Sequence, residues 1–210
     1  IGAKVVLADI DKRTINIDPN DIERKITKKT KAIIPVHIGG YPCDMTKIMK
    51  IAKTYNLKVV EDAAHAFGGW YKRKAIGTIG DFGSFSFHEV KNVTSLGEGG
   101  IVVTNSEIGK DFPKARFVGF DSSNPIEHWL YDVVALKRES DYIPAGNHST
   151  TEIQAVALLS QIKRIEKIIK ERRKNAEFLN SCFKDVDGII TPPLDTYDIT
   201  PTHHLYLIQI

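Results

Sequence analysis

The chain has 210 residues, of which 42% are hydrophobic and 26% charged, and its formal net charge is +3. This composition is typical of a folded globular chain and excludes a disordered or a collagen-like protein. The charge is too small to indicate a nucleic-acid-binding protein, and no apolar run reaches the roughly 18 residues that a membrane span requires.

The first half of the chain alternates short apolar runs with helical patterns. Asp18 before Pro19 is typical of a helix start, with Asp18 as the N-cap and Pro19 at the first helical position. Asp44 is expected to cap a second helix. Such alternation predicts right-handed βαβ units and a mostly parallel sheet. The expected elements are a strand over 5–10, a helix from Pro19 to about Ile26, a strand over 31–36, a helix after Asp44 and a strand over 57–60.

The second half begins with a glycine-rich stretch and ends with a long helical pattern. That pattern runs over residues 151–183, which is long for one globular helix, so we expect it to bend or to bridge two domains. We assign residues 1–160 to a three-layer α/β domain and 161–210 to a connecting helix and the start of a smaller domain. The other expected elements are a hairpin over 70–76, strands over 84–87 and 101–104, a turn over 97–100 and a long loop over 120–150.

Both ends of the chain are strand-like, which is unusual because natural termini are commonly polar and frayed. The chain opens at Ile1 without Met, continues into an apolar run and closes in another over residues 204–210. We therefore expect it to be an internal piece of a longer protein.

Cysteines and histidines do not indicate a metal site. Cys43 and Cys182 are the only cysteines and show no Cys-x-x-Cys spacing, which argues against a disulfide framework or a structural zinc site. Two isolated cysteines also favour a cytoplasmic location. His88, His128, His148 and His203 show no spacing of metal ligands and are interpreted as loop or edge residues, whereas His204 is expected near the substrate.

Three segments follow predicted strands, where open α/β sheets bind their ligands. Asp62 ends one strand, and a buried acid there is costly unless it is paired, although Asp62 could simply cap the next turn. Lys91 follows the strand over 84–87, although a lysine there could also be a surface charge. The glycines of residues 97–100 allow positive φ angles and close backbone approach.

Together these residues indicate one chemistry. An aldehyde cofactor such as pyridoxal phosphate needs a lysine amine for a Schiff base, a carboxylate on its pyridine nitrogen and neutral donors around its phosphate. Lys91, Asp62 and Ser86 would supply one of each.

The chain resembles the DegT/DnrJ/EryC1/StrS sugar aminotransferases, a family with the aspartate aminotransferase-like fold called fold type I. The resemblance implies a three-layer α/β large domain that lacks its N-terminal part here, followed by the start of a C-terminal domain. It rests on stretches that keep the family's order along the whole chain, namely residues 16–19, 32–37, 61–66, 80–92, 97–100, 152–155 and 204–206.

Carried over residue by residue, the resemblance implies a role for five side chains. Lys91 would be the Schiff-base and proton-transferring lysine, and Asp62 would pair with the pyridine nitrogen. His65 would lie near the phenolic oxygen of the cofactor, although a hydrogen-bonded core histidine is the alternative. Ser86 would bind the phosphate. Asn147 would reach the phosphate of a neighbouring subunit, which implies a homodimer with shared active sites.

The resemblance predicts a pyridoxal-phosphate-dependent aminotransferase that transfers an amino group to a nucleotide-linked keto-sugar, with glutamate as the implied amino donor. The product would be an amino sugar for polysaccharide, glycoprotein or antibiotic biosynthesis. A sugar dehydratase of the same family is the nearest alternative, but those enzymes replace the Schiff-base lysine by histidine, whereas Lys91 is present. A non-catalytic regulator that kept the fold is the other alternative, and it has no need of Lys91 beside Asp62.

Overall fold

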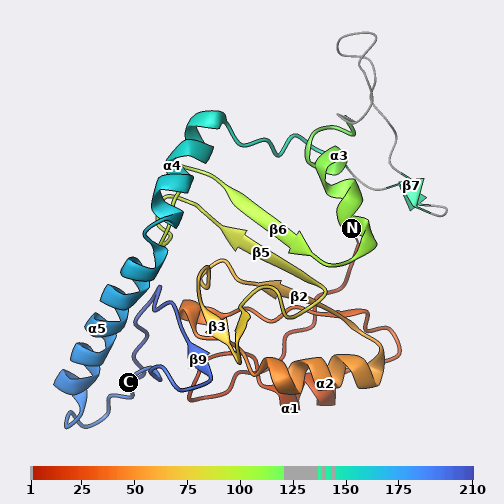
Figure 1. Cartoon of the computed structure of the whole chain (residues 1–210). Coiled ribbons are helices and arrows are strands. Elements are labelled where there is room, and N and C mark those ends of the chain that lie inside the picture. Colours follow the sequence, from red (N-terminus) through yellow and green to blue (C-terminus); the bar gives the residue numbers. More distant parts are fainter. Residues whose placement is uncertain (1, 121–136, 139–140, 143–144) are drawn as a thin grey trace.

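The computed structural model of the protein describes residues 2–120, 137–138, 141–142 and 145–210. Its main sheet has the strand order β1-β2-β5-β6 (Figure 1). The β1–β2 and β2–β5 pairs are parallel, whereas β6 is antiparallel to β5. The predicted α/β class with a mostly parallel sheet is therefore confirmed. The four strands are β1 (Ala32–Ile33), β2 (Lys58–Asp62), β5 (Phe82–Ser86) and β6 (Gly100–Thr104).

Helices α1 (Pro19–Lys25) and α2 (Met45–Tyr55) begin at the predicted caps. The Asp18 carboxylate accepts the Asn20 amide at 2.9 Å, and the Asp44 carboxylate accepts the Lys47 amide at 3.1 Å. These bonds satisfy backbone donors that a helix start leaves unpaired. Both helices bury an apolar side in one core with the strands, which includes Ile22, Ile33, Met45, Ile48, Ile51, Leu57 and Val59.

A second, smaller sheet joins distant parts of the chain. The predicted hairpin is confirmed as β3 (Trp70–Tyr71) paired with β4 (Lys74–Ala75), and β3 also pairs with β9 (Ile199–Thr200). This pairing places the segment after β9 against the short 3₁₀ helix η1 (Ile38–Gly40). There the Thr202 amide donates to the Gly40 carbonyl, and the Leu205 amide donates to the Gly39 carbonyl.

The predicted strands at both ends of the chain are wrong. In residues 5–10 only Ile10 forms a bridge, to Ile17, because no described strand lies beside this run. The side chains of Val5, Val6, Leu7 and Ile10 are exposed. In residues 204–210 only Gln209 forms a bridge, to Ile190. The preceding His203 has φ of 47°, which turns the backbone out of an extended path.

The long helical pattern forms two helices, α4 (Glu152–Ile162) and α5 (Ile165–Phe183). They are separated at Lys163 and Arg164, where the Arg164 amide bonds the Gln161 carbonyl three residues back and so tightens the last turn. Figure 1 shows the two helices as a rod along the end of the sheet toward which β5 points. None of the helices described by the structure is long and apolar enough to span a membrane.

The region between β6 and α4 holds η2 (Glu107–Asp111), α3 (Phe112–Arg116) and a short pair, β7 (Lys137–Arg138) with β8 (Asp141–Tyr142). Most of the predicted loop over 120–150 lies outside the described residues. The division of the chain at residue 160 stays a prediction.

Candidate active site

Strands β2 and β5 run parallel and end at the same edge of the sheet. In their register Asp62 lies opposite Ser84. Ser86 follows Ser84 by two positions and therefore lies on the same face, because side chains alternate along a strand. Asp62 and Ser86 thus share one face at the carboxyl edge, which is where open α/β sheets bind ligands.

Asp62 has one committed and one uncommitted carboxylate oxygen. Its Oδ1 accepts the Ala64 amide at 3.0 Å, so Asp62 does cap the turn that follows β2. Among the described residues, no hydrogen bond is made to Oδ2. The capping role therefore leaves one oxygen, and the negative charge, available to a ligand.

The His65 ring lies three residues beyond Asp62. Its Nδ1 accepts the Gly39 amide at 3.3 Å, and its ring stacks on that of His204 with centroids 4.5 Å apart. Partial burial lowers the pKa of His65, the charge of Lys91 lowers it further, and the charge of Asp62 opposes them. The charges of Lys91 and Asp62 therefore both act on this one ring.

Lys91 lies in the loop between β5 and β6, and its side chain is half-buried. Its backbone amide donates to the His88 carbonyl at 3.0 Å, and the His88 amide donates to Ser86 Oγ at 3.3 Å. No hydrogen bond within the described part of the chain involves Lys91 Nζ. The loop therefore ties Lys91 to the end of β5 and leaves its amine uncommitted.

Asn147 is the one predicted site residue that no contact among the described residues joins to the other four. It is exposed, and it forms a bridge with Phe117. Its Oδ1 accepts the Ser149 amide at 3.3 Å. An exposed amide is compatible with a role toward another subunit, and that role stays a prediction.

The sequence analysis did not identify Asn92 as a site residue. Asn92 Oδ1 lies 3.0 Å from His204 Nδ1, and Asn92 Nδ2 donates to the Thr202 carbonyl at 3.3 Å. These contacts bring the loop that follows β9 against the Lys91 loop, although more than a hundred residues separate them. In the sequence, the only signals were the two family motifs that contain Asn92 and His204, and neither indicates that these residues meet.

Glu61 points to the opposite face of the sheet from Asp62 and has a different task. It is fully buried, and its two oxygens accept four donors, which are His37 Nε2 at 3.0 Å and the amides of Gly77, Ile79 and Gly80 at 2.6–2.8 Å. Burial alone would raise its pKa, but the bonds from His37 and the amides outweigh it, and the pKa of Glu61 lies below its usual range.

The proton of His37 can be placed from its contacts. Its Nδ1 accepts the Cys43 amide at 3.1 Å, so the ring proton is on Nε2 and points at Glu61. The pair therefore fastens η1, β2 and the loop over 77–80 together within the core.

We expect Glu61→Gln to destabilise the protein by about 2–5 kcal/mol, because the new amide group would face two donors that then have no acceptor. Urea unfolding of the full-length protein measures the loss, with the exposed Glu23→Gln as a matched control. Because the pKa of Glu61 is lowered on folding, its contribution is present near neutral pH and is lost as the pH falls through the folded pKa. An unchanged unfolding midpoint for Glu61→Gln would contradict this role.

Within the described part of the chain, the rings of the other histidines make no hydrogen bond to the side chains of Asp62, His65, Ser86 or Lys91. His203 is buried and pairs with Asp195 at 3.0 Å, and His88 lies 3.5 Å from Glu98, while His128 lies outside the described residues. Within the described ranges, no group of three or more His, Cys, Asp or Glu residues could hold a metal ion.

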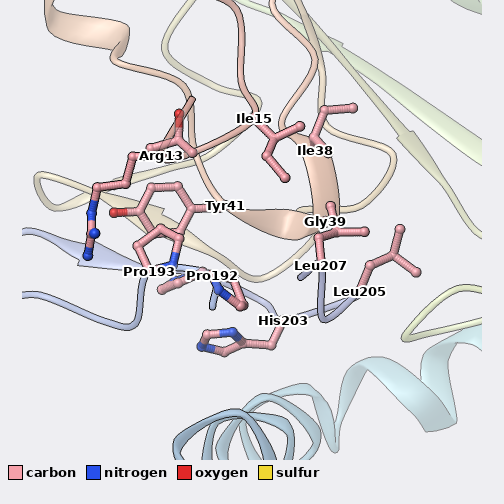
Figure 2. A pocket seen from close by; sticks show the side chains of 12 residues that line it. Arg13, Ile15, Ile38, Gly39, Tyr41, Pro192, Pro193, His203, Leu205 and Leu207 are labelled. Atoms are coloured by element: carbon pink, nitrogen blue, oxygen red, sulfur yellow. The ribbon is translucent and has the colours of Figure 1, made fainter. Parts of the chain in front are cut away.

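A pocket adjoins the segment where Gly39 meets His203 and Leu205 (Figure 2). It is lined by Arg13, Tyr41, Pro192, His203 and others, and it has a volume of about 20 Å³. This is enough for one buried water molecule, which needs roughly 10–15 Å³ of such space. None of Asp62, His65, Ser86 and Lys91 lines the pocket.

The fold and these side chains define an α/β protein whose candidate site is at the carboxyl edge of a mostly parallel sheet. The sequence profile of the DegT/DnrJ/EryC1/StrS aminotransferase family matches residues 1–210, and the chain belongs to this family. The chain spans about half the length of the curated relatives it matches.

Two relatives and one solved structure illustrate the similarity. The spore coat polysaccharide biosynthesis protein SpsC of Bacillus subtilis is 37% identical over 100% of this chain and 53% of its own length. The GDP-perosamine synthase of Escherichia coli O157:H7 is 36% identical over 99% of this chain and 52% of its own. The putative sugar aminotransferase Spr1654 of Streptococcus pneumoniae in its PMP form is 32% identical, with a TM-score of 0.80 over 98% of this chain and 54% of its own.

Proposed function

We propose that this chain carries the cofactor-binding centre of a pyridoxal-phosphate-dependent sugar aminotransferase. One observation carries the proposal: four chemically different groups, the Lys91 amine, the Asp62 carboxylate, the Ser86 hydroxyl and the His65 imidazole, come from the ends of two adjacent parallel strands and the loops that follow them.

The chemistry of this set fits the cofactor. Lys91 Nζ, Asp62 Oδ2 and His65 Nε2 make no hydrogen bond within the described part of the chain, and Ser86 Oγ accepts one and can still donate. Pyridoxal phosphate has a matching aldehyde, ring nitrogen, phenolic oxygen and phosphate. Spr1654, which resembles this chain, has been solved in both PLP and PMP forms.

When bound, the cofactor would supply an aldehyde that carries the amino group and a ring that withdraws electrons from the reacting carbon. Lys91 Nζ would hold the aldehyde and, when released, move a proton between two carbons. The Asp62 carboxylate would keep the ring nitrogen protonated. His65 Nε2–H would donate to the phenolic oxygen, and Ser86 Oγ–H would donate to the phosphate.

We propose a nucleotide-linked keto-sugar as the amino acceptor and glutamate as the donor. The acceptor is supported by the similarity to a protein named GDP-perosamine synthase, at 36% identity, and to a spore coat polysaccharide biosynthesis protein, at 37%. Glutamate is the donor that the family resemblance implies. Amino sugars for polysaccharide, glycoprotein or antibiotic synthesis are the corresponding products. The cytoplasmic location stays a prediction.

The decisive experiment offers the full-length protein several nucleotide-linked keto-sugars together with glutamate. We expect a visible absorption band that borohydride abolishes, and an amino sugar formed in step with 2-oxoglutarate. Loss of a hydroxyl group without amine transfer would indicate the dehydratase. A protein without a borohydride-sensitive band would indicate the non-catalytic regulator, and either result would overturn the proposal.

We further propose a homodimer in which Asn147 donates a hydrogen bond to the phosphate in the neighbouring subunit, since its side chain is exposed and its amide donates without adding charge. We expect Asn147→Ala to weaken cofactor binding by about tenfold, the effect of losing roughly 1.4 kcal/mol. Cofactor titration measures this loss, with Asn175→Ala on α5 as the control.

Mixed dimers test whether the sites are shared. A subunit with Lys91→Ala and a partner with Asn147→Ala would together regain one complete site of the two. If both parents dimerise but the mixture recovers no activity, Asn147 does not serve the neighbouring site.

A further inference from the structure

Two imidazole rings stack beside the Lys91 loop. The ring centroids of His65 and His204 lie 4.5 Å apart, and the planes are tilted by 38°. Both side chains are half-buried. Each ring binds the protein through Nδ1, and neither Nε2 has a hydrogen bond to a described residue. Within the described part of the chain, both Nε2 atoms are therefore uncommitted.

The tautomer of His65 follows from its backbone contact. The Gly39 amide can only donate, and it lies 3.3 Å from His65 Nδ1. Nδ1 is therefore the acceptor, and in the neutral ring the proton is on Nε2. His65 thus presents an N–H donor at its uncommitted end.

Asn92 sets the opposite tautomer in His204. Its Nδ2 donates to the Thr202 carbonyl at 3.3 Å, which fixes the orientation of the amide because Oδ1 would repel that carbonyl. Oδ1 then faces His204 Nδ1 at 3.0 Å and requires a proton there. In the neutral ring His204 therefore presents an unprotonated Nε2, which is an acceptor.

The surroundings keep both rings neutral. Burial, followed by the charges of His65, Lys91 and Arg172, lowers the pKa of His204 to about 4. Burial and Lys91 also lower the pKa of His65, against the opposing charge of Asp62. Arg172 is held in place from α5, since its Nη1 donates to the carbonyls of His203 and His204.

We propose that Asn92 is a positioning residue that fixes the His204 tautomer, so that the stacked pair presents one donor, His65 Nε2–H, and one acceptor, His204 Nε2, beside Lys91. This deepens the proposed function, on which it rests for its role in catalysis. The acceptor suits an N–H or O–H group of a substrate that reaches Lys91, either the ammonium of the amino donor or a hydroxyl of the sugar.

The tautomers can be read directly by ¹⁵N NMR of the full-length protein labelled at histidine, at neutral pH and without substrate. We expect His204 to be protonated only at Nδ1 and His65 only at Nε2, with His204→Gln and His65→Gln used to assign the signals. A proton on Nε2 of His204 would overturn the proposal. The tautomers are measured without any reaction. The tautomer proposal can therefore be wrong while the proposed function is right, and the proposed function can be wrong while the tautomers are as proposed.

Asn92→Ala tests the positioning role. We expect His204 to become a mixture of tautomers and kcat/KM to fall about tenfold, as for the loss of roughly 1.4 kcal/mol. Thr202→Val is the matched control, because it removes the Thr202 hydroxyl bond to the His65 carbonyl, at 2.5 Å, in the same segment without touching either ring nitrogen. The control should keep the wild-type tautomers. Unchanged His204 tautomers in Asn92→Ala would refute the role of Asn92.

The KM values for glutamate and for the keto-sugar show which substrate group binds to His204 Nε2. His204→Phe keeps an aromatic ring against His65 but has no acceptor nitrogen. A rise in KM for glutamate alone would assign the ammonium, and a rise for the sugar alone would assign a hydroxyl. If neither KM changed, His204 Nε2 would not be a substrate acceptor.

Discussion

Replacing Lys91 with alanine is expected to lower the turnover of the holoenzyme by more than about 10⁴-fold, the upper range for loss of a proton-transfer group, because the lysine also holds the cofactor. The fold should persist, since Lys91 is only half-buried and its Nζ makes no hydrogen bond within the described part of the chain. Turnover with glutamate and keto-sugar, together with the visible spectrum before and after borohydride, measures the effect.

Lys74→Ala is the control for this variant, because Lys74 is an exposed lysine in the β3–β4 hairpin. It should retain the absorption band and the turnover of the wild type. If Lys91→Ala still formed the borohydride-sensitive band at wild-type levels, another amine would hold the cofactor and the assignment of Lys91 would be wrong.

Asp62→Asn is expected to retain the cofactor and to lower turnover by roughly 10²–10³-fold, the size found when one preorganised electrostatic group is removed. The amide has the size of the carboxylate but no charge, so it cannot hold the ring nitrogen in its protonated form. Steady-state kinetics and cofactor titration of the full-length protein would measure the two effects separately.

The structure makes Asp62→Asn a specific test. The Asn side-chain oxygen can still accept the Ala64 amide, as Asp62 Oδ1 does at 3.0 Å, so the turn after β2 keeps its cap. Asp62→Ala loses both the charge and the cap, and should also lose about 1 kcal/mol of stability. If Asp62 were only a cap, Asp62→Asn would have near-normal turnover, and the pairing with the cofactor would be refuted.

The local features of this chain could be predicted from its sequence. Asp18 and Asp44 cap α1 and α2 as expected, because a cap needs only a short side chain beside the first free amides of the helix. The hairpin of β3 and β4 and the strand β5 were also predicted, because turn residues and alternating side chains act over a few positions. The placement of Asp62 at the end of β2 and of Lys91 after β5 followed from the same patterns.

Features that need a partner far away in the sequence, such as strand pairing, could be determined only from the tertiary structure. Residues 5–10 and 204–210 have the pattern of strands, but a strand needs a neighbour with free backbone groups, and the described structure provides only single bridges. Adjacent carboxylates at the end of β2 likewise look alike in sequence, whereas the pleat sends Glu61 into the core and Asp62 to the candidate site.

The pairing of Asn92 with His204 is the clearest case, since it joins two loops through one side-chain contact of 3.0 Å. No periodicity relates residues so far apart along a chain. They meet because β9 pairs with β3 and the following residues bond to Gly39 and Gly40, where Gly40 has φ of 88° and a Cβ would lie 2.0 Å from Thr202 Oγ1. The sequence by itself therefore determined which groups follow the strands, and only the folded chain determined which of them meet, because a side-chain contact depends on the path of the whole backbone.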